Sequence, residues 1–179
     1  LGYGDDTAIW FAQALGGWYH LIDYEEGNGK TIHDYVVALN QRAYIYGAHW
    51  LPWDSVSAMT HVKLAGGDRS KSIEQLMREA CGSVPVRVTP AMKISDQLNA
   101  ARTIFPQVRI DRQACAAGIK SLRNYQWPPK SATGAIAPKP LHNWASHASS
   151  AFCNLAVSIK QPGAEPKPQP RPEVEYSPY

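Results

Sequence analysis

The sequence predicts an α/β fold in which an antiparallel strand ribbon leads into a mixed sheet flanked by helices. Residues 7–26 contain two β-branched and aromatic segments separated by a Gly-Gly pair. From residue 31 onward, amphipathic helical patterns alternate with short apolar strands. Between these parts, Tyr-Gly-Ala-His-Trp-Leu-Pro-Trp-Asp (46–54) has the pattern of a buried strand that ends on a carboxylate. The 179 residues suffice for one domain with a substantial core.

The ribbon is predicted as strands over 7–15 and 18–26, joined by a two-residue turn at Gly16-Gly17. Period-two alternation defines the two faces of the return strand. Trp18, His20, Ile22 and Tyr24 are expected on one face, and Tyr19, Leu21 and Asp23 on the other.

A first helix is expected after Thr31, a suitable N-cap, with its apolar face formed by Ile32, Tyr35, Val36 and Leu39. The strand within 46–54 stops at Pro52, because proline has no N–H to donate to a ladder. Asp54 is then placed at the carboxyl end of that strand, where open α/β sheets bind their ligands.

The second half alternates helices and strands. Residues 55–71 are expected as a polar loop, followed by a helix whose capping box is Ser72 with Gln75. Strands are predicted over 85–89 and 108–110, each followed by a helix, the first capped by Ser95 and the second by Asp111.

A proline-containing loop over 126–140 precedes the last predicted helix, residues 141–159. One stripe of this helix is apolar: Leu141, Trp144, Ala148, Ala151 and Leu155. A second stripe is polar and consists of Asn143, His147, Ser150 and Asn154. Residues 1–160 are therefore taken as one domain, and the proline-rich residues 161–179 as a disordered tail.

If one further strand precedes Leu1, the ribbon becomes a three-stranded meander feeding a parallel α/β part. That order of elements is the layout of the ribonuclease H fold. The chain opens without an initiator Met or a signal-peptide pattern, so we expect a fragment that begins inside an element.

Composition narrows the functional classes. No apolar run approaches 18 residues, which argues against a membrane span. Three separated cysteines favour reduced, packed thiols over a disulfide frame or zinc site. The net charge is only +3, but residues 93–139 hold eight basic and two acidic side chains, a local charge of +6. Such a segment attracts polyanions, although a solvated basic face is the plain alternative.

Trp53 and Trp127 are expected to reach solvent or DNA, and the tryptophans at 10, 18, 50 and 144 to lie in the core.

Four separated motifs resemble one family. They are Leu-Gly-Tyr-Gly-Asp-Asp-Thr-Ala-Ile-Trp-Phe (1–11), the 46–54 stretch, Leu-Asn-Ala-Ala-Arg (98–102) and Lys-Pro-Leu-His-Asn-Trp-Ala-Ser-His-Ala-Ser-Ser-Ala-Phe (139–152). In this order they resemble the C-terminal nuclease domain of the large terminase subunit, the DNA-packaging motor of tailed double-stranded DNA phages and prophages. The resemblance runs from residue 1 to about residue 159.

The resemblance implies a metal-dependent endonuclease that cuts concatemeric double-stranded DNA in the host bacterial cytoplasm. It implies Mg²⁺ or Mn²⁺ as a two-ion site, with the ions about 4 Å apart and held by carboxylates. The implied partners are double-stranded DNA, an upstream ATPase domain, the small terminase subunit and the portal. The basic residues expected to contact DNA are Arg102, Arg112, Lys120, Arg123, Lys130 and Lys139.

The resemblance also assigns the catalytic positions. The family opens on Asp-x-Gly-x-x-Asp-x-Thr, which places the first carboxylate just before Leu1, and Asp54 matches the second. The third is normally the Asp of His-Ala-x-Asp-Ala-Phe, and Ser150 stands there, with His147 one turn earlier. Asn143 also replaces a frequent Asp.

Each of these residues could instead have a purely structural role. Asp54 could cap the next segment, and His147 could be a packed polar residue rather than one that positions DNA or a metal-bound water. Asp5 and Asp6 have the character of turn formers, although either could substitute for a missing metal ligand. Two functions stay open: an active endonuclease domain, or a catalytically impaired DNA-binding or motor-docking domain of the same fold.

Overall fold

The computed structural model describes residues 6–57, 59–64, 67–130, 134, 137 and 139–159, and for 59–64 and 67–69 the backbone alone. Asp5 and the predicted tail over 161–179 lie outside the described residues. The chain is an α/β protein with a mixed sheet flanked by helices. The helices are α1 (Ile32–Gln41), α2 (Ile73–Ala80), α3 (Ile94–Ile104), α4 (Ala116–Asn124) and α5 (Ser146–Ile159), with 3-10 turns η1 (Trp53–Val56) and η2 (Phe105–Gln107).

The strands form three ladders. β1 (Thr7–Leu15), β2 (Trp18–Gly27) and β7 (Val108–Ile110) make a mixed sheet in that order, with β1 antiparallel and β7 parallel to β2. β3 (His49–Leu51) and β6 (Val86–Val88) form a parallel pair. β4 (Met59–Leu64) and β5 (Gly67–Ser72) form a separate antiparallel hairpin.

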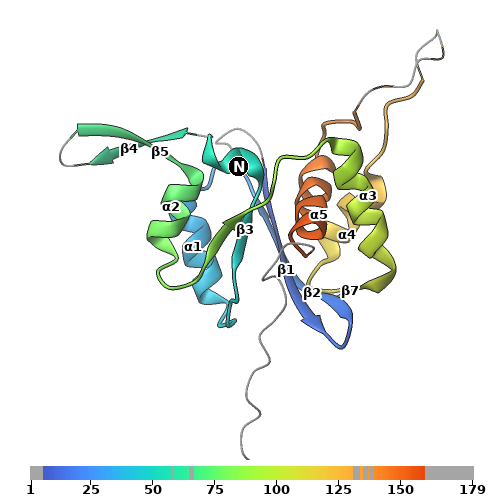
Figure 1. The fold of residues 1–179 in the computed structure, drawn as a ribbon, viewed down its shortest axis with the longest axis horizontal. Helices are drawn as coiled ribbons and strands as arrows, with labels where there is room; N and C mark the ends of the chain where they lie inside the picture. Colours follow the sequence, from blue (N-terminus) through green and yellow to red (C-terminus); the bar gives the residue numbers. More distant parts are fainter. Residues whose placement is uncertain are drawn as a thin grey trace, which may run out of the picture.

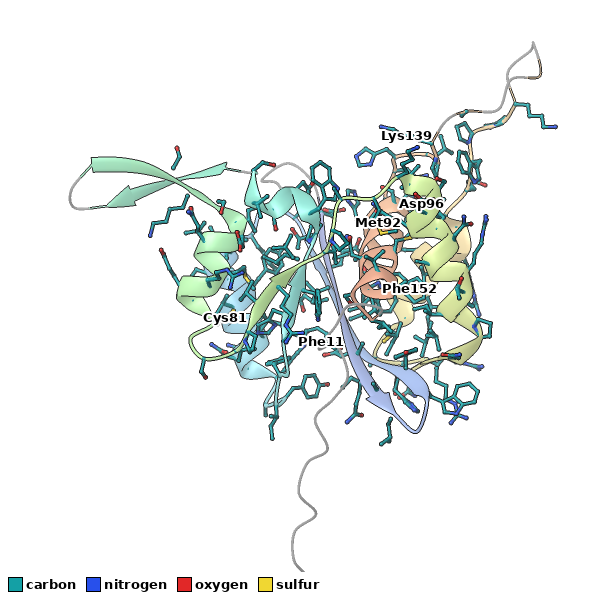
Figure 2. All side chains as sticks on the ribbon, in the orientation of Figure 1. Phe11, Cys81, Met92, Asp96, Lys139 and Phe152 are labelled. Atoms are coloured by element: carbon teal, nitrogen blue, oxygen red, sulfur yellow. The ribbon has the colours of Figure 1, made fainter. Side chains whose placement is uncertain are left out.

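Two helical layers cover the strands: α1 and α2 lie on one side, and α3, α4 and α5 on the other (Figure 1). Each layer has its own core. Leu21 and Phe152 belong to the core beneath α3, α4 and α5. Phe11, Leu51 and Val86 belong to the core beneath α1 and α2. Figure 2 shows Phe11 and Phe152 on opposite sides of β1. The strands therefore sit between two independent apolar interfaces.

β1 and β3 share neighbours but no ladder. Both pack against α5, and both contribute to the core that contains Phe11. Yet β1 pairs only with β2 and β3 pairs only with β6 in the part of the chain that the structure describes. Each of these two strands therefore has one edge without a strand partner there.

The predicted ribbon is confirmed, with one correction. The strands begin and end within one residue of the predicted bounds, and Gly16 and Gly17 adopt φ of 59° and 79°, as a two-residue hairpin turn requires. The predicted faces of β2 are wrong beyond Leu21. The register shifts between Phe11 and Ala12, whose partners are Asp23 and Leu21, so Ile22 is an unpaired bulge residue. The extra residue returns Tyr24 to the same core as Leu21.

Helix α1 begins as predicted, because Thr31 forms a capping box with Asp34. At its other end, the Arg42 guanidinium donates to the carboxylates of Asp23 and Glu25, at 2.6 Å each, and lies 4.6 Å from the centre of the Phe11 ring. These contacts fasten the end of α1 to β2.

Several later predictions are also confirmed. Ser72 and Gln75 form the capping box of α2, and β7 has the predicted bounds. The cysteines are free thiols, buried at Cys115 and Cys153 and half-buried at Cys81.

Other predictions are wrong. Residues 55–71 contain η1 and most of the β4–β5 hairpin rather than only loop. The N-cap of α3 is Lys93, so Ser95 lies inside the first turn. Asp111 accepts bonds from the N–H groups of Gln113 and Ala114, which caps the turn before α4 rather than α4 itself.

The last helix begins at Ser146 instead of residue 141. The Asn143 side chain accepts a hydrogen bond from the Ala145 N–H, and its backbone carbonyl accepts one from the Ser146 N–H, which forms a tight turn there. That turn leaves Trp144 49% exposed, with Lys120 5.5 Å from its ring centre. Trp18 is also exposed, because it lies at the hairpin end under the Arg109 guanidinium.

Candidate functional site

Asp54 follows β3 directly, in the first turn of η1. Pro52 ends the strand and serves as the N-cap of η1 without a side-chain cap. The Asp54 side chain is exposed, and its carboxylate makes no hydrogen bond or ion pair to any described residue. The capping role considered for it is therefore absent from this part of the chain, and the carboxylate is free to accept an external cation or donor.

The polar stripe of α5 reaches the same strand ends. Thr89, which follows β6, is buried, and its Oγ1 lies 3.2 Å from the Leu51 carbonyl oxygen and 3.3 Å from Asn154 Oδ1. Its single proton can be donated to only one of them at a time. The Thr89 N–H also donates to the Leu51 carbonyl, at 2.9 Å. Thr89 therefore joins the ends of β3 and β6 to α5. Its contact on β3 is Leu51, which lies three residues before Asp54.

Ser150 lies one helical turn before Asn154, about 6 Å along the helix axis and on the same face. Its side chain is exposed. The helix is held in this position by β1, because Trp10 Nε1 donates to the Ala148 carbonyl at 2.9 Å. Asp54 is thus three residues along the chain from Leu51, and Ser150 is one helical turn from Asn154, the two residues that Thr89 contacts.

Other predicted site residues have defined neighbours. His147 is half-buried and its ring packs edge-on against His142, with 5.4 Å between ring centres. Asn143 uses its Oδ1 for the turn before α5, so its amide oxygen already serves a structural role. Asp6 is partly exposed just before β1.

The oxygen donors at this edge are of the kind that the implied ions bind, but they carry too little negative charge for two such ions. Carboxylate, hydroxyl and amide oxygens are ligands that Mg²⁺ and Mn²⁺ accept. Among the residues that the structure describes, no group of three or more His, Cys, Asp or Glu side chains is close enough to hold a metal ion. Asp54 is the one carboxylate that the resemblance places at this edge within the described chain. These residues alone do not make a two-ion site.

The structure adds one buried polar group that the sequence did not single out. Ser55, beside Asp54, is 1% exposed, and its Oγ has no hydrogen-bond partner among the described residues. Thr89 was also missed, although its place between an apolar strand and Pro90 marks it as a strand-ending residue.

The predicted DNA-contacting cations all lie at the surface. Arg102 is on α3, Lys120 and Arg123 are on α4, and Arg112, Lys130 and Lys139 are on connecting segments. None of the six makes an ion pair with a described residue. Figure 2 shows Lys139 at the same end of the molecule as Asp96 near the start of α3. The positive charges of the six cations are therefore available to an anionic partner.

The hairpin extends away from the body beside α2 (Figure 1). It follows η1 after a two-residue gap in chain order, and its sequence includes Lys63, Arg69 and Lys71. Its strands pair from Met59 with Ser72 to Leu64 with Gly67. A basic ribbon thus begins a few residues after Asp54.

A cavity lies against α5, on a face other than the polar stripe. Its volume is about 600 Å³, and its walls come from α3, α5 and the segment that follows α4. Ser149 lines it while the neighbouring Ser150 does not. The cavity and the polar stripe are therefore on different faces of one helix.

No helix in the described part of the chain is both long enough and apolar enough to cross a membrane. No family model, curated protein or solved structure matches the chain.

Proposed function

We propose that this chain is a ribonuclease H-like endonuclease domain of the kind found in phage large terminase subunits. Its substrate in this proposal is concatemeric double-stranded DNA, and its cofactor is Mg²⁺ or Mn²⁺. The ATPase domain, small terminase subunit and portal are the proposed partners.

The observation that carries the proposal is the junction at Thr89. It joins Asn154, on the polar stripe of α5, to the ends of β3 and β6; Asp54 lies three residues after Leu51, and Ser150 lies one helical turn before Asn154. These are the positions to which the resemblance assigns the second and third metal carboxylates. The two motifs are 96 residues apart in the sequence, and the proposed fold requires a tertiary contact between the elements that carry them.

The free edges of β1 and β3 also support it. The resemblance places a strand before Leu1, antiparallel to β1 and carrying the first catalytic carboxylate. A strand between β1 and β3 would join the ladders β7-β2-β1 and β3-β6 into one sheet. Its carboxyl end would lie beside the start of β1, on the side of the molecule where β3 ends and Asp54 follows.

A catalytically impaired DNA-binding or motor-docking domain is the second candidate. It is favoured by the neutral side chain at Ser150, since a hydroxyl attracts a divalent ion far less than a carboxylate does. The exposed cations would still bind DNA through its phosphates.

Plasmid nicking in Mn²⁺ separates the two. A chain extended upstream of Leu1 should convert supercoiled plasmid to the open-circular form, and Asp54→Ala should abolish the conversion. Asp96→Ala, an exposed carboxylate at the start of α3, is the matched control and should cut normally. Absence of metal-dependent nicking, with DNA binding that weakens as salt rises, would favour the impaired domain. Absence of both activities would refute the proposal.

A further inference from the structure

We propose that the cavity beside α5 binds an unpaired base of a single DNA strand. Its position separates it from the Asp54 edge, and none of the positions assigned to metal or catalysis lines it. The inference rests on the proposed function only in taking DNA as the polymer. It concerns binding and requires no cleavage.

The walls of the cavity are aromatic. Phe105, Tyr125, Trp127 and Phe152 all line it, together with aliphatic side chains of α3 and α4. Phe105 and Trp127 are 52% and 42% exposed, which is unusual for side chains of this size. Aromatic rings at the mouth of a cavity offer flat faces on which a base can stack.

The aromatic walls are held in place. Phe105 packs edge-on against Phe152, with 5.7 Å between ring centres, and Phe152 itself is buried in the core. On the opposite wall, the Gln126 carbonyl accepts a hydrogen bond from the Leu141 N–H at 3.0 Å. That bond ties the segment carrying Tyr125 and Trp127 to the segment leading into α5. A preformed site loses less entropy when it binds a ligand.

The charge around the cavity selects an anion. Arg102 lines it, Arg123 follows the lining residue Leu122, and Lys139 precedes the lining residue Pro140. No acidic side chain lines it among the residues described. A volume of about 600 Å³ is within the usual range for small-ligand sites, roughly 300 to 1,000 Å³. Apolar walls with a lining arginine match a base attached to its phosphates, and suit a neutral apolar ligand less well.

The cavity and the polar stripe lie on different faces of one helix. Ser149 lines the cavity and Ser150 lies on the polar stripe, and a helix with its side chains is roughly 10 Å wide. A single strand can cross that distance in a few nucleotides. A base displaced from a duplex near the Asp54 edge could therefore reach the cavity.

The test measures binding of a 5′-labelled oligothymidine by fluorescence anisotropy without divalent ions, so nuclease activity does not enter. A second oligonucleotide of equal length carries abasic sites, and a blunt duplex is the third probe. We expect oligothymidine to bind more tightly than the abasic strand. Trp127→Ala should weaken oligothymidine binding roughly 5- to 100-fold, the usual loss when a stacking ring is removed. Its effect on the abasic strand and the duplex should stay below about twofold.

Trp18→Ala is the matched control, because Trp18 is also an exposed tryptophan, lies at the end of the β1–β2 hairpin and does not line the cavity. It should leave oligothymidine affinity unchanged. Phe105→Ala should repeat the loss from the other wall, and circular dichroism spectra confirm that each variant is folded.

Equal affinity for oligothymidine and the abasic strand would overturn the proposal. So would a Trp127→Ala variant that binds all three probes as the natural chain does. If that variant also made residues 160–179 more sensitive to protease, the cavity would instead be a docking site for the proline-rich segment of this chain. Failure of the nicking assay with this pattern intact would refute the nuclease and leave the base-binding site standing.

Discussion

Gly118→Ala should destabilise the protein, although alanine is the better helix former. Gly118 is buried in α4 against β1. An added Cβ would lie 2.3 Å from Trp10 Cη2 and 2.7 Å from Cζ2, whereas real Cβ atoms essentially never approach within 3.0 Å. The ring would therefore have to move, or α4 would have to withdraw from the sheet.

Trp10 has little freedom to move. Its Nε1 donates to the Ala148 carbonyl at 2.9 Å, and its ring packs against Tyr24 and Phe152 with centres 4.6 and 6.3 Å away. Overpacking typically costs about 1–3 kcal/mol, and loss of the hydrogen bond adds about 1 kcal/mol. The gain in helix propensity offsets about 1 kcal/mol. The net loss is about 2 kcal/mol, which lowers the melting temperature by roughly 4–8 °C for a chain of this length.

Urea and thermal unfolding followed by circular dichroism measure this loss. Trp10→Phe supplies the control, because a smaller ring relieves the overlap. In that background, Gly118→Ala should cost at least about 1 kcal/mol less than it does alone. A neutral or stabilising Gly118→Ala would show that helix propensity dominates, and would refute the packing of α4 and α5 on β1 described above.

Three further predictions test other contacts. Arg42→Met leaves the partly buried Asp23 without a cation and Glu25 with Lys30 alone, and should cost about 2 kcal/mol in urea unfolding. Arg78→Ala, which breaks an exposed pair on α2, should cost less than about 0.5 kcal/mol. A loss of equal size for both would contradict the burial of the Arg42 pair. Burial lowers the pKa of His49 in β3, so the unfolded chain binds a proton at this histidine before the folded chain does as pH falls. The free energy of unfolding should therefore drop as pH falls below about 6.5. His49→Gln should reduce that drop. An unchanged dependence of stability on pH in His49→Gln would show that His49 does not cause the drop. Thr89→Val should cost about 1–2 kcal/mol, with a smaller cost for Asn154→Ala, which leaves the bond to the strand intact.

The parts of the fold that follow local chemistry could be predicted from the sequence. Gly16-Gly17 requires positive φ, Thr31 and Ser72 are followed by partners at the third helical position, and Pro52 ends a strand. At these positions each signal acts over a few residues and depends little on tertiary contacts. The bounds of β1, β2, α1 and β7 were accordingly close to those observed.

The errors arose where tertiary contacts decide the structure. Gly-Asp-Arg-Ser-Lys-Ser (67–72) contains residues that disfavour strands, and only pairing with the β4 segment makes it one. Ala65-Gly66, between the two strands, was the available signal for the hairpin. The bulge at Ile22 is set by pairing with β1 and leaves no mark in the alternation pattern. At the site, the stripe of His147, Ser150 and Asn154 was visible as a period of 3.6, whereas Asn143 lies in the turn before α5. The contact of Asn154 with Thr89 depends on how α5 packs.

The central claim is that Asp54 and Ser150 face the same cation-accepting edge. Electron paramagnetic resonance of Mn²⁺ titrated into Ser150→Asp tests it directly, because a second carboxylate at that edge should bind the ion with Asp54. We predict at least about fivefold tighter Mn²⁺ binding than in the natural chain, since affinity for hard cations rises with the number of charged oxygen ligands. The gain should vanish in the Asp54→Ala/Ser150→Asp double variant. Unchanged Mn²⁺ affinity in Ser150→Asp, or a gain that survives loss of Asp54, would contradict the account.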